Sequence, residues 1–301
     1  MNLKRLLAGL VLLGAMGAAA GWMLSAPQPL TAAALPKHTA DLANGERLFH
    51  AGGCLSCHKP DKADTAADPK LPSGGMAMHT PAGDLYPPNL TPDPETGLAK
   101  WTDLDFVNAV QRGISPDGQH YIPAFPYTSY AQMKTEDVLD IRAYLASLAP
   151  VTSPKKNGLP LEFFVRRGTG LWKLLGLDTT PWTPDPAQSA SWNRGSYLVN
   201  GPGHCNECHT PRNLFMVTDK SRFLMGGPHP EDPKIKVPSL HDLTSRKCYK
   251  NAKDIAFAFA NGALSGCEKI ESGGMASVQT NLSHLPDEDQ LAIAEYLLSL
   301  K

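Results

Sequence analysis

The sequence predicts an all-α protein built from two copies of one helical unit behind an N-terminal apolar segment. The first observation is a repeat, because Cys54 lies 151 residues before Cys205 and Pro88 lies 150 residues before Pro238. The second is apolar residues at helical spacing, without the alternating runs that would indicate a sheet. A near-constant offset across several landmarks indicates two copies of one unit rather than one large fold.

Length and charge agree with this organisation. The 301 residues leave room for two units of about 100 to 150 residues each. The formal net charge is −1 and no basic stripe is present, so the sequence does not indicate nucleic-acid binding.

The first 25 residues read as a membrane anchor or a signal segment. Lys4 and Arg5 precede an uncharged run of 19 residues, Leu6 to Leu24, which is close to the roughly 20 residues that cross a bilayer as a helix. The small residues at 31–34 leave cleavage as the alternative. We expect a retained anchor with its basic end in the cytoplasm and the rest of the chain exported.

Each copy is expected to open and close with a helix. The first opening helix has Asp41 as its N-cap and stops at Gly52-Gly53, and the second begins near Trp192. The closing helices are expected over Thr135–Leu148, with Thr135 as N-cap, and over Asp287–Leu300.

The copies are expected to span residues 36–150 and 191–301, joined by a linker over 151–190. The linker has Pro-rich ends around a short amphipathic helix over 161–175. That helix either packs across both copies or offers a docking surface to a partner or the bilayer.

Two pentapeptides share the pattern C-x-x-C-H. This is the haem-attachment signature, in which two thiols add to the porphyrin vinyl groups and the adjacent His binds iron. A zinc site made from the two C-x-x-C pairs would leave the His after each pair unexplained, and a thioredoxin-like motif would need a βαβ pattern. We therefore expect two covalently bound haem c groups. The residues of the two motifs are Cys54, Cys57, His58, Cys205, Cys208 and His209.

Two cysteines remain outside the motifs. Cys248 and Cys267 flank the middle helix expected in the second copy, at places where the first copy has no cysteine. Disulfides form in the oxidising compartments to which such a chain is exported. The sequence therefore predicts a disulfide between these two residues.

The arrangement of these motifs resembles a known family. Two helices flanking C-x-x-C-H, a Pro-x-Leu loop and a last helix ending in Tyr-Leu are similar to the class I cytochrome c domain, here in tandem. The phrases Pro88–Asp93, Trp101-Thr102 and Gly203-His204-Cys205 resemble the membrane-anchored dihaem and trihaem cytochromes that serve as electron-accepting subunits of bacterial periplasmic dehydrogenases. The resemblance covers about residues 40–150 and 190–301, and it implies two tandem class I cytochrome c domains after a transmembrane helix.

The same resemblance implies roles for further residues. The carbonyl of Pro88 would accept the Nδ1–H of His58, and that of Pro238 would accept the Nδ1–H of His209, which fixes the tautomer of each ligand. Trp101 would hydrogen-bond a haem propionate in the first copy.

The sixth iron ligands differ between the copies. Met275 is expected to bind the second iron as a thioether. The aligned position in the first copy is Ala124 or Phe125, neither of which can bind iron, so Met133 is the nearest candidate. The alternatives for the first iron are Met76, Met78, His120 or an open position.

The resemblance implies electron transfer rather than catalysis. The expected protein is a periplasmic cytochrome anchored in the bacterial inner membrane, which accepts electrons from a dehydrogenase subunit. A soluble cytochrome, a quinone or a terminal oxidase would be the acceptor. The alternative is a dihaem peroxidase-type enzyme, in which one haem would be an open catalytic site.

Overall fold

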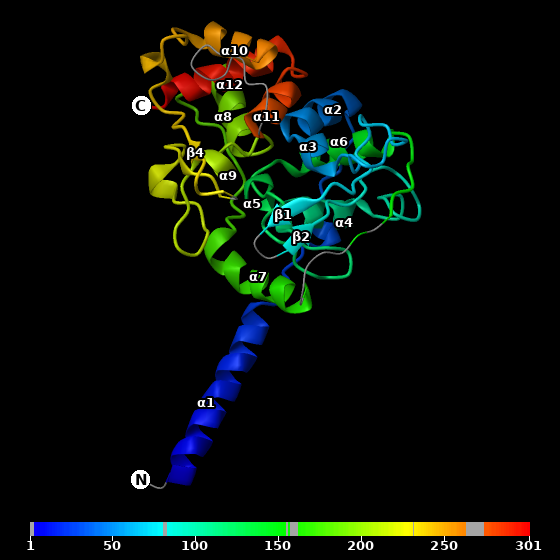
Figure 1. Cartoon of the computed structure of the whole chain (residues 1–301), viewed down its shortest axis with the longest axis vertical. Coiled ribbons are helices and arrows are strands. Elements are labelled where there is room, and N and C mark those ends of the chain that lie inside the picture. The colour runs from blue at the N-terminus through cyan, green and yellow to red at the C-terminus, as the bar shows by residue number, and fades with distance from the viewer. Residues whose placement is uncertain (1–2, 81–82, 155, 157–161, 231, 263–273) are drawn as a thin grey trace.

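The computed structural model describes residues 3–80, 83–154, 156, 162–230, 232–262 and 274–301. Helices account for most of the regular structure in this part of the chain, as expected. Figure 1 shows a long N-terminal helix projecting from a body in which the remaining helices gather.

The helices fall into an N-terminal group and a C-terminal group along the chain. The N-terminal group comprises α2 (Leu42–Ala51), α3 (Cys54–His58), α4 (Asp103–Val107) with its π-helical continuation η2 (Asn108–Arg112), α5 (Tyr127–Tyr130) and α6 (Thr135–Ala146). The C-terminal group comprises α8 (Ala190–Asn200), α9 (Asn206–His209), α10 (Ala252–Asn261), α11 (Gly274–Leu282) and α12 (Asp287–Ser299). Helix α7 (Glu162–Gly176) lies between them in sequence, and single 3₁₀ turns occur at η1 (Ala32–Ala34), η3 (Lys220–Arg222) and η4 (Leu243–Ser245).

In each group the opening helix crosses the closing helix at a glycine. Helix α2 packs on α6 and α8 packs on α12. A Cβ on Gly45 would lie 2.1 Å from the carbonyl oxygen of Asp140, and one on Gly195 would lie 1.9 Å from that of Ala292. Only glycine lets the backbones approach this closely, so equivalent glycines fix equivalent crossings in the two groups.

The helix starts follow local capping. Asp41 caps α2 by accepting from the backbone N–H of Asn44 at 3.1 Å, as expected. The expectation for Thr135 was wrong, because Thr135 is the first residue of α6 and Lys134 occupies the N-cap position. Helix α8 begins two residues before Trp192, because Ser189 caps it by accepting from the Trp192 N–H at 3.0 Å.

Two short hairpins were not expected from the sequence. Strand β1 (Met78–Thr80) pairs antiparallel with β2 (Gly83–Leu85), and β3 (Gly227–Pro228) pairs with β4 (Lys236–Val237). Strands of two or three residues are too short to show alternation in a sequence.

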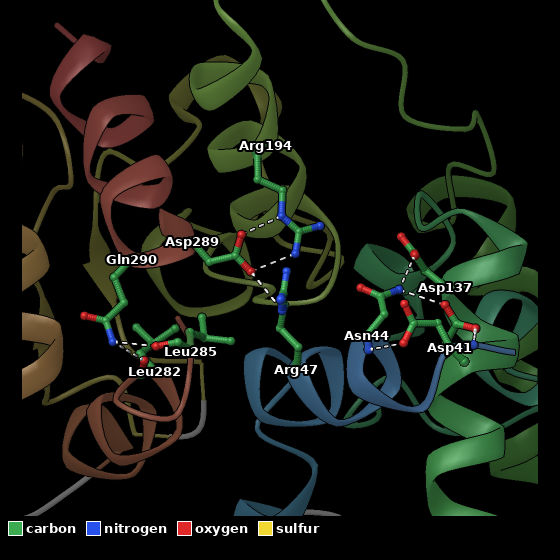
Figure 2. A network of polar contacts seen from close by, with 10 residues as sticks. Asp41, Asn44, Arg47, Asp137, Arg194, Leu282, Leu285, Asp289 and Gln290 are labelled. Carbon is green, nitrogen blue, oxygen red and sulfur yellow. Dashed lines mark hydrogen bonds and ion pairs between the residues drawn. The ribbon is translucent and has the colours of Figure 1, made fainter. Parts of the chain in front are cut away.

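The two groups share one hydrophobic core, and α2 lies at the junction. Figure 2 shows Asn44 of α2 directed towards Asp137 of α6 on one side, and Arg47 directed towards Asp289 of α12 on the other. The buried Asp289 carboxylate accepts two hydrogen bonds from Arg194 of α8, at 2.7 and 2.8 Å. A buried carboxylate is stable here because it is paired and hydrogen-bonded.

The N-terminal helix α1 (Leu3–Leu24) is long and apolar enough to cross a membrane. Its large apolar side chains are exposed, and its window of highest hydropathy is unburied. A signal sequence near the N-terminus would share this length and composition.

Cys248 is disulfide-bonded in the structure. Its expected partner, Cys267, lies outside the described residues, so the pairing stays a prediction.

Candidate functional site

The first C-x-x-C-H motif forms the short helix α3, which follows a left-handed turn at Gly53. The ring Nδ1 of His58 lies 2.7 Å from the carbonyl oxygen of Pro88. A carbonyl can only accept, so Nδ1 carries the proton and the lone pair is on Nε2. Burial lowers the pKa of His58 to about 4, so the imidazole is neutral and suited to bind a metal.

The second motif repeats this geometry. His209 ends α9, and its Nδ1 lies 2.8 Å from the carbonyl oxygen of Pro238. Burial lowers the pKa of His209 as well. Each motif thus presents a neutral imidazole with Nε2 available.

One glycine holds each His against its Pro loop. Neither glycine was expected from the sequence to be a site residue. The backbone N–H of Gly74 donates to the His58 carbonyl at 2.7 Å, and that of Gly226 donates to the His209 carbonyl at 2.7 Å. Both have φ of 74°, and an added Cβ would lie 2.6 Å from the carbonyl carbon of Pro88 or Pro238. The signal was present, since Gly74 and Gly226 are 152 residues apart and follow the repeat.

The four motif cysteines form no disulfide with one another. Burial raises the pKa of Cys54 and of Cys205 to about 12, so these thiols are protonated. Within the described ranges, no three His, Cys, Asp or Glu side chains gather as a metal site would require. This arrangement does not support a zinc site built from the two cysteine pairs.

The donor set of each motif fits haem c. Two thiols on one turn can form thioethers with one porphyrin edge, and the following imidazole presents a free Nε2 to iron. The group supplies reversible one-electron chemistry when bound.

The remaining expected site residues are spread over several elements. Met133 is 2% exposed and lies in the core just before α6, where its Cγ would be 3.3 Å from a Cβ on Gly201. Met275 is half-buried in the first turn of α11, and Trp101 is half-buried just before α4.

His120, an alternative ligand for the first iron, has both ring nitrogens in other contacts. Its Nε2 lies 2.9 Å from the Ser25 carbonyl oxygen, and its Nδ1 lies 3.0 Å from Lys173 Nζ. This arrangement leaves neither nitrogen for iron.

Each group of helices contributes polar contacts to the motif of the other group. Asn281 of α11 donates to the hydroxyl of Ser56, inside the first motif, at 2.7 Å. In return, the hydroxyl of Ser129 in α5 lies 3.0 Å from Asn206 Oδ1 and 2.9 Å from Glu207 Oε1, inside the second motif. The residues between the two cysteines of each motif are therefore positioned by the opposite group.

A direct bridge joins the backbones next to the two motifs. The carbonyl oxygen of Gly52, two residues before Cys54, is 3.2 Å from the Nε2 of His204 and 3.2 Å from the hydroxyl of Tyr130. His204 immediately precedes Cys205. One hydrogen bond thus connects the segment that carries the first motif with the segment that carries the second.

A helical fold with neutral His ligands on C-x-x-C-H turns defines a c-type cytochrome. A model of the cytochrome c family matches residues 42–149. The diheme cytochrome c-type protein of Cereibacter sphaeroides is 41% identical over 295 residues, which cover 98% of this chain and 97% of that protein. The chain belongs to the cytochrome c family.

Two further relatives are components of dehydrogenases. A subunit of the nicotinate dehydrogenase of Pseudomonas putida is 38% identical over 301 residues, covering 96% of this chain and 24% of that protein. The fructose dehydrogenase cytochrome subunit of Gluconobacter japonicus is 31% identical over 276 residues, covering 91% of this chain and 55% of that subunit. The chain therefore spans about a quarter and about half of these two proteins.

Proposed function

We propose that the chain is a periplasmic, membrane-anchored dihaem cytochrome c that carries electrons from a dehydrogenase to a respiratory acceptor. It comprises two tandem class I cytochrome c domains, residues 36–150 and 191–301, joined by the linker 151–190. The observation that carries the proposal is the pair of C-x-x-C-H turns, each with a His hydrogen-bonded to a Pro carbonyl, held together across one core.

In this proposal each haem is held by one motif and by a sulfur ligand. His58 and His209 would each bind one iron, with Met275 as the second protein ligand of the second iron and Met133 as that of the first. His/Met ligation raises the potential of a haem. Trp101 would hydrogen-bond a propionate of the first haem.

The protein contributes position and environment rather than bond chemistry. The Pro88 and Pro238 carbonyls hold the imidazole protons on Nδ1 and strengthen the iron ligands. The contacts of Asn281, Ser129 and His204 fix the two turns relative to each other. Fixed spacing of two redox centres supports electron passage between them without motion of the chain.

The donor and the location are inferred from the relatives and from α1. Several relatives are named as cytochrome subunits of dehydrogenases, so we infer a dehydrogenase as the electron donor. Helix α1 would anchor the chain in the bacterial inner membrane, with the haem domains in the periplasm. A soluble cytochrome, a quinone or a terminal oxidase would accept the electrons.

The test is purification of the full chain from its native membrane in mild detergent. Intact mass should show two haems per chain, and both should be reduced when the substrate of the co-purifying dehydrogenase is added. A variant with Cys205→Ser and Cys208→Ser should carry one haem. Rapid peroxide turnover by the purified chain without any dehydrogenase would instead support the dihaem peroxidase alternative, which the names of the relatives do not favour.

A further inference from the structure

Helix α7 presents its polar side to the protein. Lys173 is 8% exposed and donates from Nζ to the carbonyl oxygens of Arg112 at 2.6 Å and Gly113 at 2.8 Å. Thr169 and Gly170 are buried on the same side. A buried lysine that donates to the carbonyl oxygens at the end of η2 therefore anchors α7, where an apolar stripe would usually do so.

The opposite side of α7 is apolar and exposed. Phe164, Leu171 and Leu175 follow a spacing of seven and four residues, which places them on one face of a helix. Their exposed fractions are 70%, 43% and 64%, and that of the neighbouring Leu174 is 60%. A water-facing helix shows the reverse pattern, so this helix is built to face an apolar medium.

A loop of the C-terminal group extends the same surface. The indole N–H of Trp172 in α7 donates to the Phe215 carbonyl at 2.9 Å, which ties this loop to the helix. Leu214 is 94% exposed and Phe215 is 62% exposed at its tip. We define the apolar base as Phe164, Leu171, Leu174, Leu175, Leu214 and Phe215.

The apolar base adjoins the end of α1. The guanidinium of Arg167 lies 4.1 Å from the ring centre of Trp22 and donates to the Trp22 carbonyl. A Cβ on Gly170 would lie 2.3 Å from the Ser25 carbonyl oxygen. Figure 1 shows α7 lying across the end of α1, between α1 and the body. Tryptophan is enriched at the membrane–water interface, which places α7 at that level if α1 crosses the bilayer.

The charges of α7 are engaged within the protein. Arg166 pairs with Glu162 at 2.6 Å, Arg167 lies over Trp22, and Lys173 is buried. Contact with a membrane would therefore depend on buried apolar area and only weakly on anionic lipids.

We propose that the apolar base is a second membrane contact, with α7 lying in the plane of the interface and its apolar side chains in the acyl boundary. This inference rests on the proposed anchoring by α1. A single spanning helix lets the body tilt, whereas α7 would fix its face to the bilayer and so fix the direction in which the two C-x-x-C-H turns point.

Spin labels on the full, haem-loaded chain in phosphatidylcholine nanodiscs test the proposal. Single cysteines are introduced as Leu171→Cys and Leu175→Cys, with Phe257→Cys on α10 as the matched control, because Phe257 is also an exposed apolar helix residue, at 65%. Leu13→Cys in α1 reports the anchor. Accessibility to oxygen is compared with accessibility to a water-soluble nickel complex.

We expect the spin labels at positions 171, 175 and 13 to be more accessible to oxygen than to the nickel complex. The label at position 257 should be more accessible to the nickel complex than to oxygen. If the labels at 171 and 175 were more accessible to the nickel complex while the label at 13 was more accessible to oxygen, the inference would be overturned and the anchor would stand. The same would hold if both positions became protected only after a dehydrogenase was added, because the apolar base would then be a protein interface. Nickel accessibility at 13 would instead contradict the proposed anchor.

Discussion

Replacing Gly226 by alanine should disturb the hydrogen bond between His209 and the Pro238 carbonyl, although Gly226 is not part of that bond. Gly226 donates its N–H to the His209 carbonyl and lies against the Pro238 segment. Its φ is 74°, and an added Cβ would be 2.6 Å from three backbone atoms, the Val237 oxygen, the Pro238 carbonyl carbon and the Ser239 nitrogen. Backbone atoms cannot rotate away as a side chain can, so the Pro238 carbonyl must shift from His209.

The loss in free energy of unfolding caused by Gly226→Ala has two parts, which a control variant can separate. A left-handed backbone costs an alanine about 1–2 kcal/mol, and forcing a methyl into a filled space costs about 1–3 kcal/mol more. Gly118 also has φ of 74°, but a Cβ there would meet nothing within 4 Å. Gly118→Ala should therefore show the first cost alone, and Gly226→Ala should show both.

The measurements are denaturant unfolding and a spectroscopic redox titration of the haem-loaded chain. We expect Gly226→Ala to lower the free energy of unfolding by about 1–3 kcal/mol more than Gly118→Ala does. A weaker hydrogen bond to Nδ1 makes His209 a poorer donor to iron, so the potential of one haem should rise while the other stays unchanged. Equal destabilisation by the two variants, with both potentials unaltered, would refute the reasoning.

Three further predictions concern the core, the linker helix and the sulfur ligands. Asp289→Asn removes the charge of a buried carboxylate that is paired with the half-buried Arg194 and Arg47, and it should cost about 2 kcal/mol in urea unfolding. Glu95→Gln, in an exposed pair with Lys100, should cost under about 0.5 kcal/mol, and similar costs for the two variants would contradict this ranking. Burial lowers the pKa of Lys173 to about 7, so the folded state binds fewer protons than the unfolded state between pH 7 and 10, and the free energy of unfolding should rise with pH in that window. Denaturant unfolding of Lys173→Met should lack this rise of up to about 1.4 kcal/mol per pH unit, and parallel pH curves would exclude the assignment. Met275→Ala and Met133→Ala should each remove the weak iron–sulfur absorption band of one haem; a variant whose spectrum is unchanged would show that its methionine is not a ligand.

The motifs and the principal helices were predictable because their signals are local. The C-x-x-C-H pattern requires only neighbouring residues to be read together, and the repeat is found by comparing such local patterns along the chain. Asp41 as a cap and the placement of α12 follow from the same short-range rules. The Pro88 and Pro238 contacts came from the resemblance, and the geometry at 2.7 and 2.8 Å agrees with it.

The features that were missed depend on tertiary contacts. Helical spacing in α7 shows that one face is apolar, but not whether that face points inward. The inward face is decided by Lys173, which donates to the carbonyl oxygens of Arg112 and Gly113 about 60 residues earlier in the chain. The roles of Gly74 and Gly226 likewise depend on what lies against them, which a lone glycine in a sequence does not reveal.

The contacts between the two motifs make the helical groups interdependent rather than independent copies. Ser56 takes its partner Asn281 from a residue 225 positions later, and Asn206 takes Ser129 from 77 positions earlier. Each partner lies on a helix that also packs within its own group. Asn281 is on α11, which packs against α10, and Ser129 is on α5, which packs against η2. Because residues inside each C-x-x-C-H turn are held this way, a change at Asn281 or Ser129 should be felt at the motif of the opposite group. Such contacts fix the spacing between the two motifs. We therefore infer that this spacing, and not only the stability of each unit, is what the contacts preserve.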